Sequence, residues 1–149
     1  MDIKVHLYNA CKLHIEKRAK TIETTISSNQ NALQAETKSS AGDKHETGRA
    51  MLQLEMEKAG QQLAVINQMK ETLGKINVEN NSNIACLGSV IYTNKANYFL
   101  SVSAGQITVN NEIFFAISVS SPIGKLLLGK QAEDVILFNG NKIVLKTIL

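Results

Sequence analysis

Hydrophobic positions in the first half of the chain follow the period of an α-helix. From about residue 5 to residue 38 there is no proline or glycine, and charged residues fall mostly between the apolar ones. Apolar residues at three-, four- and seven-residue steps gather on one face of a helix. The predicted apolar seam is Leu7, Cys11, Leu13, Ile15, Ile22, Ile26 and Leu33.

A second helical run extends from Thr47 to Leu73 and consists mostly of strong helix formers. It gives the first helix a partner, which residues 24–31 need because Thr, Ser and Asn are poor helix formers. Gly60 interrupts the second run at a cost of about 1 kcal/mol relative to Ala. It marks either a close approach of the two helices or a weak turn. The predicted facing seam is Met51, Leu54, Leu63, Ile66, Met69 and Leu73.

Between these runs, residues 39–50 hold small residues, two glycines and two carboxylates, Asp43 and Glu46. Helices joined by a short connection pack as antiparallel neighbours. Two runs of about 30 residues at 1.5 Å per residue give arms of about 45 Å. No third amphipathic helix follows in the sequence, which argues against a compact three-helix bundle. We therefore predict a two-helix antiparallel coiled coil over residues 1–75, with its tip at residues 39–50.

The second half of the chain changes character after Gly74, which is placed as a helix stop signal. Asn139-Gly140 indicates a β-hairpin turn, and Ser121 followed by Pro122 indicates the capped start of a short helix over residues 121–130. Residues 76–149 are thus predicted to form a small antiparallel sheet with one short helix, which makes the chain α+β. The predicted strands cover residues 84–93, 97–102, 106–109, 112–119, 134–138 and 142–149.

Composition adds few constraints. The formal net charge of +3 is too small to indicate a nucleic-acid-binding protein by charge alone. Cys11 and Cys86 match no metal-site spacing or disulfide framework, and we expect both to be reduced thiols. The first residues carry charges at Asp2, Lys4 and Lys12 and match no signal peptide. With no apolar run of about 20 residues, the sequence favours a cytoplasmic protein.

Two motifs together resemble the bacterial Gre family of transcript cleavage factors, GreA and GreB. The first is Gly42-Asp43-Lys44-His45-Glu46, where the family typically has Gly-Asp, two variable residues and Glu. The second runs from Ser118 to Lys130, with a Ser-Pro-Ile step and a Leu-Gly-Lys turn, and is followed by the acidic pair Glu133-Asp134. The second motif is long and specific. The first is short but lies at the expected place in the chain.

This resemblance implies an FKBP-like fold for residues 76–149 and a transcription elongation factor that binds RNA polymerase. In the family, the globular domain docks at the rim of the polymerase secondary channel and the coiled coil reaches through it. The tip carboxylates then help to hold a second Mg²⁺ at the polymerase active centre, where backtracked RNA is hydrolysed. The sequence departs from the family pattern at Thr47, Gly48 and Arg49, and it lacks the Arg-Pro step before the tip.

The residue types at the tip fit this chemistry. Mg²⁺ is usually held by one or two carboxylates together with phosphates and water, and residues at i and i+3 of a helix share one side. Asp43 and Glu46 are accordingly the expected catalytic and metal-binding pair, acting only within the polymerase complex and without standalone activity. The alternative is that Asp43 and Glu46 only stabilise the start of the second helix through the helix macrodipole.

Other residues are expected to make contacts in that complex, in which DNA or nascent RNA could also be touched. Cationic side chains near the tip are expected to meet RNA or polymerase: Lys38, Lys44 and Arg49. The short helix is expected to supply the polymerase-docking residues Ser121, Pro122, Ile123 and Leu127.

Three other functions stay open, one of which is a structural coiled-coil adaptor, for which the tip should be dispensable. A channel-binding protein of the same shape could inhibit polymerase, although retention of both Asp43 and Glu46 favours stimulation. An FKBP-like domain could instead act as a peptidyl-prolyl isomerase or chaperone. Such activity needs an aromatic-lined pocket, and the aromatic residues of this half are Tyr92, Tyr98, Phe99, Phe114, Phe115 and Phe138, with no Trp.

Overall fold

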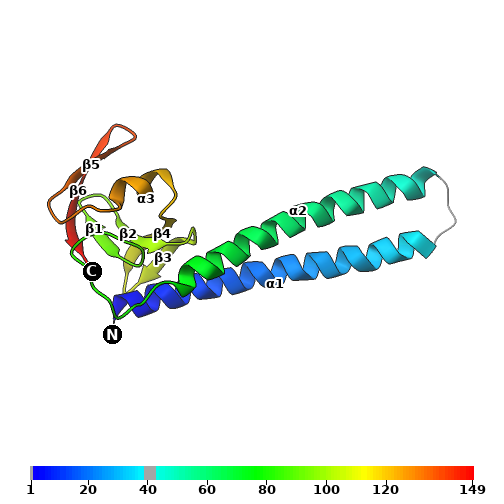
Figure 1. Cartoon of the computed structure of the whole chain (residues 1–149), viewed down its shortest axis with the longest axis horizontal. Helices are drawn as coiled ribbons and strands as arrows, with labels where there is room; N and C mark the ends of the chain where they lie inside the picture. Colours follow the sequence, from blue (N-terminus) through cyan, green and yellow to red (C-terminus); the bar gives the residue numbers. More distant parts are fainter. Residues whose placement is uncertain (1, 39–42) are drawn as a thin grey trace. The chain divides into compact units, whose positions relative to one another are not determined.

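The computed structural model describes the backbone of residues 2–38 and 43–149, and the side chains of residues 2–35 and 47–149. The fold is α+β, as predicted: two long helices precede a mostly antiparallel sheet with one short helix (Figure 1). The elements in order are α1 (Ile3–Lys38), α2 (Asp43–Gly74), β1 (Val90–Thr93), β2 (Asn97–Ser101), β3 (Gly105–Val109), β4 (Glu112–Ser118), α3 (Pro122–Leu127), β5 (Val135–Phe138) and β6 (Asn141–Ile148).

Contacts divide the chain into two compact units. One unit, the arm, is Ile15–Met69 and contains most of the two long helices. The other, the sheet unit, comprises the residues up to His14 together with Lys70–Leu149, so the first turns of α1 and the last residues of α2 belong with the sheet. Neither long helix, nor any other helix in the described part of the chain, is apolar enough to cross a membrane.

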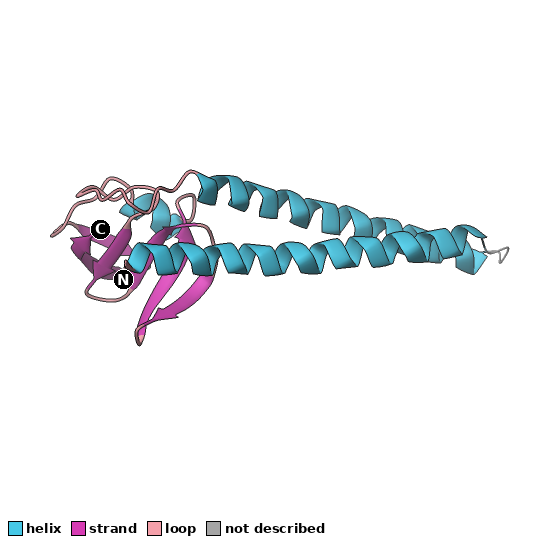
Figure 2. Cartoon of the chain, turned by 90° about the horizontal axis from the view of Figure 1, so that it is seen from below, coloured by secondary structure: helices cyan, strands magenta, loops and turns pink. Residues whose placement is uncertain are grey.

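In the arm, α1 and α2 run side by side as an antiparallel pair (Figure 2). Their buried apolar side chains are Ile15, Ala19, Ile22, Ala59, Ile66 and Met69. On α2 the half-buried and buried positions Leu52, Met56, Ala59, Leu63 and Ile66 alternate four- and three-residue steps, which is coiled-coil spacing.

Three residues of the predicted seams lie outside this interface. Leu13 is 54% exposed, Met51 60% and Leu54 67%. The prediction was wrong for them because only residues in the four-and-three register face the partner helix, and these apolar residues fall beside that register. Gly60 is solvent-exposed, and a Cβ built on it meets no atom within 4 Å, so it does not mark a close helix approach.

The six strands form one sheet in the order β3-β4-β2-β1-β6-β5. All neighbouring pairs are antiparallel except β2 and β4, which are parallel with Phe99 opposite Ala116. The sheet is thus mostly antiparallel, as predicted, with β2 and β4 as the one parallel pair. In the β5–β6 hairpin, Asn139 (φ 51°) and Gly140 (φ 80°) form the predicted turn, because both positions require positive φ.

The first predicted strand is much shorter than expected. Residues 84–89 lie outside any strand, with a turn at Leu87 and Gly88, and β1 is limited to Val90–Thr93. Gly88 has a φ of 93°, which lies outside the extended region, and Ile84 is 47% exposed. The apolar residues of this segment therefore do not belong to a strand, and the prediction extended the strand too far towards the N-terminus.

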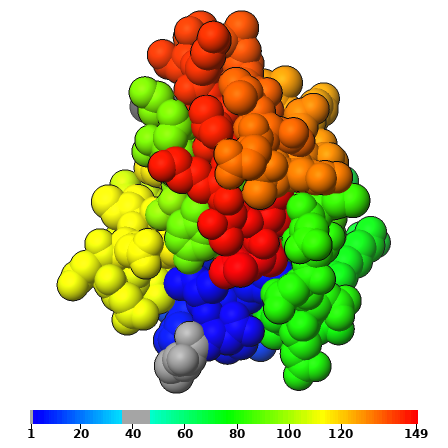
Figure 3. All heavy atoms as spheres, turned by 90° about the vertical axis from the view of Figure 1, so that its left-hand side faces the viewer, coloured from blue at the N-terminus to red at the C-terminus, as the bar shows by residue number. Residues whose placement is uncertain are grey.

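The start of α1 is packed on the sheet within the same unit. Leu7 and Cys11 are fully buried, and the Cys11 sulfur lies 3.7 Å from the Ser101 hydroxyl on β2. The Lys4 ammonium donates a hydrogen bond of 2.5 Å to the carbonyl of Asn80. The space-filling view shows this end of α1 (blue) directly beside the sheet residues (yellow to red) (Figure 3). This packing explains why residues up to His14 belong to the sheet unit rather than to the arm.

Candidate functional site

The acidic pair predicted at the tip lies in the first turn of α2. The helix α1 ends at Lys38 and α2 begins at Asp43, so the predicted tip of residues 39–50 is mostly helical backbone. The connection at residues 39–42 and the side chains of Lys38, Asp43, Lys44 and Glu46 lie outside the described residues. What the structure gives for these residues is their place at the ends of the two helices.

The first turn of a helix is a favourable position for carboxylates. The first turn of a helix carries unpaired N–H groups and the positive end of the helix dipole, which stabilise negative charge. Positions i and i+3 share one side of a helix, and Asp43 and Glu46 have this spacing in α2. Two carboxylates leave most of the Mg²⁺ coordination sphere unfilled, which suits a metal shared with a second macromolecule.

Arg49 is the tip cation whose side chain is described, and it is exposed. It lies three residues after Glu46 on α2, on the same side of the helix. An exposed guanidinium offers several fixed donors for phosphate or carboxylate oxygens. Arg49 is thus available to a partner that approaches the end of the arm.

The predicted docking residues on α3 have different surroundings. Ser121 is the N-cap: its hydroxyl donates to the Ser118 carbonyl at 2.6 Å and accepts from the Gly124 N–H at 3.1 Å. Pro122 occupies the first helical position and is exposed. Ile123 (9% exposed) and Leu127 (0%) belong to the core that α3 shares with the sheet. Of the predicted set, Pro122 is the residue with an exposed side chain.

The Ser118–Lys130 motif has glycine at position 124 because there is no room for a Cβ atom there. A Cβ on Gly124 would overlap the carbonyl oxygen of Ser118 and lie 2.9 Å from the Ser121 hydroxyl. The turn before α3 and the first turn of the helix therefore approach each other more closely than any side chain at this position allows. The Ser-Pro-Ile-Gly sequence is a local packing requirement of the α3 cap.

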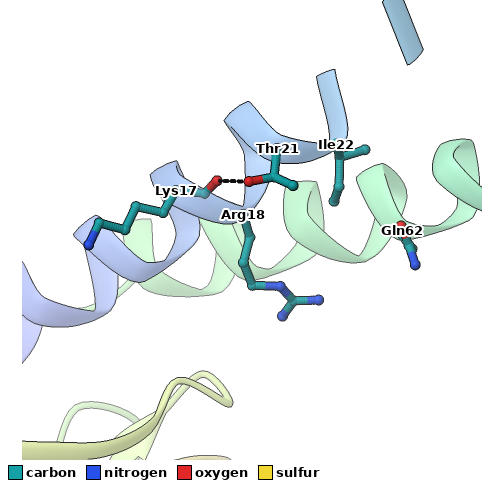
Figure 4. A pocket seen from close by; sticks show the side chains of 5 residues that line it. All are labelled: Lys17, Arg18, Thr21, Ile22 and Gln62. Carbon is teal, nitrogen blue, oxygen red and sulfur yellow. Dashed lines mark hydrogen bonds between the residues drawn. The ribbon is translucent and has the colours of Figure 1, made fainter. Parts of the chain in front are cut away.

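A basic groove on the arm was missed by the sequence analysis. It has a volume of about 310 Å³ and is lined by Lys17, Arg18, Thr21, Ile22 and Gln62 (Figure 4). The Thr21 hydroxyl donates to the Lys17 carbonyl at 3.1 Å, and an Arg18 N–H contacts the sulfur of Met69 on α2 at 3.9 Å. The cluster Lys17-Arg18-Ala19-Lys20 is visible in the sequence and was the signal available for it.

A second groove, lined by Lys20, Glu23, Thr24, Ser27, Ser28 and Asn31, lies on the same helix. Together the two grooves place lysine and arginine beside several hydroxyl groups on one stretch of α1. Cations and hydroxyls are the donors that phosphate oxygens accept from. Among the described residues, no three His, Cys, Asp or Glu side chains lie close enough to hold a metal ion.

Aromatic residues of the sheet mostly serve the core. Phe99 and Phe114 are fully buried, and Phe114 packs edge-on against Tyr92 with ring centroids 5.7 Å apart. Tyr98 and Phe115 form a second, tilted pair at 6.3 Å. Buried rings cannot form the walls of an open pocket, so Phe99 and Phe114 are not available for binding a proline ring.

Comparisons with known proteins give little further information. No family model matches the chain, and no curated protein sequence does. A solved structure of a protein described as the transcription factor Gfh1 is similar over 95% of this chain and 92% of that chain, at 16% identity and a TM-score of 0.34. A match of this strength carries no argument about function.

Proposed function

We propose that this protein is a cytoplasmic transcription elongation factor that binds RNA polymerase and stimulates cleavage of backtracked RNA. One observation carries the proposal: the Gly-Asp-x-x-Glu motif falls where α2 begins, at the end of an antiparallel helix pair. In this proposal, a carboxylate pair at the end of a two-helix arm would enter a channel that a globular domain cannot enter. The Ser118–Lys130 motif, which forms the capped helix α3, supports the same function.

In this proposal, Asp43 and Glu46 would hold Mg²⁺ together with ligands supplied by polymerase and RNA. When bound, Mg²⁺ lowers the pKa of a coordinated water and neutralises charge on the scissile phosphodiester. The two carboxylates would orient the shared ion, from positions three residues apart in the first turn of α2. Bond cleavage belongs to the polymerase active centre, so we expect no hydrolysis by this chain alone.

Lysine and arginine side chains of the arm are proposed to make further contacts in the complex. Arg49, with Lys38 and Lys44, would meet RNA or polymerase at the end of the arm, and the grooves at Lys17, Arg18 and Lys20 offer further phosphate contacts. Pro122 is the exposed member of the predicted docking set on α3. We propose that it contacts polymerase, while Ile123 and Leu127 support the helix from the core side.

The test is a transcript cleavage assay on stalled RNA polymerase with the wild-type chain, Asp43→Asn and Glu46→Gln. We expect both variants to compete for polymerase as the wild type does, with cleavage lost. Glu57→Gln removes an exposed carboxylate from the same helix and is the matched control, with cleavage expected to remain. Unchanged cleavage in the Asp43→Asn, Glu46→Gln double variant would rule out metal donation by the tip.

The same assay separates the inhibitory alternative. If the wild-type chain slows RNA extension without stimulating cleavage, the protein is a channel-binding inhibitor instead. The prolyl isomerase alternative is tested by a peptide isomerisation assay. We expect no activity there, because two of the six aromatic residues of this half, Phe99 and Phe114, are fully buried.

A further inference from the structure

A polar residue is buried in the seam between the two arm helices. Asn29 is 8% exposed, and its side-chain Nδ2 is the one buried polar side-chain atom in the described part of the chain that lacks a hydrogen-bond partner. Ile22, Ile26, Asn29 and Leu33 follow at steps of four, three and four, so Asn29 occupies a core position of the coiled coil. A buried amide donor without an acceptor weakens the packing around it.

Burial of apolar residues also stops near Asn29. In the part of the arm formed by residues 15–22 and 59–69, Ile15, Ala19 and Ile22 of α1 and Ala59, Ile66 and Met69 of α2 are buried. We define the distal arm as residues 24–35 and 47–56, for which side chains are described. No apolar side chain in it is fully buried: Ile26, Leu33, Leu52 and Met56 are half-buried, and Met51 and Leu54 are largely exposed.

The helical conformation of α1 has low intrinsic stability in the same region. Residues 24–31 include Thr24, Thr25, Ser27, Ser28, Asn29 and Asn31, all poor helix formers. The Thr24 hydroxyl donates to the Lys20 carbonyl at 2.9 Å, and the Thr25 hydroxyl donates to the Thr21 carbonyl at 3.1 Å. Such bonds to the carbonyl four residues earlier slightly destabilise and bend helices. Three independent features thus weaken one segment.

We infer that the distal arm is a separate low-stability unit, which opens locally while the rest of the arm stays folded, and that Asn29 determines how readily it opens. Regions with few buried apolar contacts open with smaller free energies than the global unfolding free energy. The boundary lies at Ile22 and Ala59, the last buried apolar pair of the arm. Local opening requires no partner, so it stands independently of the proposed function.

The test is native-state hydrogen exchange of the full-length chain, measured by mass spectrometry on peptides from the two parts of the arm. We expect amides of the distal arm to exchange at least about tenfold faster than those of residues 15–22 and 59–69. Asn29→Leu should slow exchange in the distal arm by about tenfold, because it removes the unpartnered donor and adds apolar burial. Amides of residues 15–22 should change little.

Asn31→Leu is the matched control, since Asn31 is exposed on the same helix and the substitution raises helix propensity equally. We expect it to slow exchange much less than Asn29→Leu. Equal effects of the two variants would assign the weakness to propensity alone and overturn the role of Asn29. Uniform protection along the wild-type arm would overturn the existence of a separate distal unit.

Discussion

Gly60→Ala tests whether Gly60 has a structural role in the arm. Gly60 lies in the interior of α2, at a solvent-exposed position. A Cβ there meets no atom within 4 Å, so alanine adds no clash and leaves the helix pairing unchanged. Glycine costs about 0.5–1 kcal/mol relative to alanine in a helix interior. We therefore expect Gly60→Ala to stabilise the arm by about that amount. In a chain of this size the gain corresponds to about 2–4 °C in Tm per kcal/mol.

The measurement is thermal and urea unfolding followed by far-ultraviolet circular dichroism, which reports mainly on the two long helices. Gly105→Ala provides the matched control. A Cβ at Gly105 also has open space, but its φ of 74° is strained for any residue with a side chain. That variant should lose about 1 kcal/mol or more. A Gly60→Ala variant no more stable than the wild type would mean that α2 uses Gly60 for a contact or a bend, contrary to the open surroundings of this glycine.

Three other predictions concern the sheet unit. Gly124→Ala should destabilise the protein by about 2 kcal/mol or more in urea unfolding, because its Cβ overlaps the Ser118 carbonyl; Lys125→Ala, on the exposed side of α3, should change stability by less than about 0.5 kcal/mol. In native protein, a thiol reagent should modify Cys86 rapidly and Cys11 only after unfolding, since Cys11 is fully buried. Burial raises the pKa of Cys11 above its usual 9.0, so the unfolded chain ionises first and the stability from Cys11 is lost as the pH rises above 9.0. A Cys11→Ala variant should show a smaller alkaline loss than the wild type, and equal losses would contradict this assignment.

Elements with a local cause could be predicted from the sequence. The start of α3 follows from Ser121 and Pro122, whose cap and fixed φ depend on neighbouring residues only. The β5–β6 turn follows from Asn139-Gly140 for the same reason. The first long helix follows from the absence of proline and glycine over residues 5–38, and the second follows from its strong helix formers despite Gly60. The start of α2 was predicted less well, because the second helical run was expected to begin at Thr47 and the helix begins at Asp43, within the acidic motif.

Features that depend on distant partners were less predictable. The face of α1 and α2 that becomes buried is decided by the other helix, so Leu13, Met51 and Leu54 were assigned to the wrong side. The parallel pairing of β2 with β4 requires β3 to lie outside β4, and no local pattern specifies this order. The burial of Lys4, at 3% exposure, depends on the Asn80 carbonyl, which lies far along the chain.

Burial along α1 differs between the start of the helix and its distal part. At its start, Lys4, Leu7 and Cys11 are buried by contacts with the sheet unit, which is the large and well-packed part of the chain. Within the arm, α1 packs against α2, and a pair of helices buries only a narrow seam. A hairpin therefore becomes less stable towards its free end unless its seam is strongly apolar. Asn29 makes the seam less apolar in the distal arm, and the exposed Thr and Ser residues around it are poor helix formers.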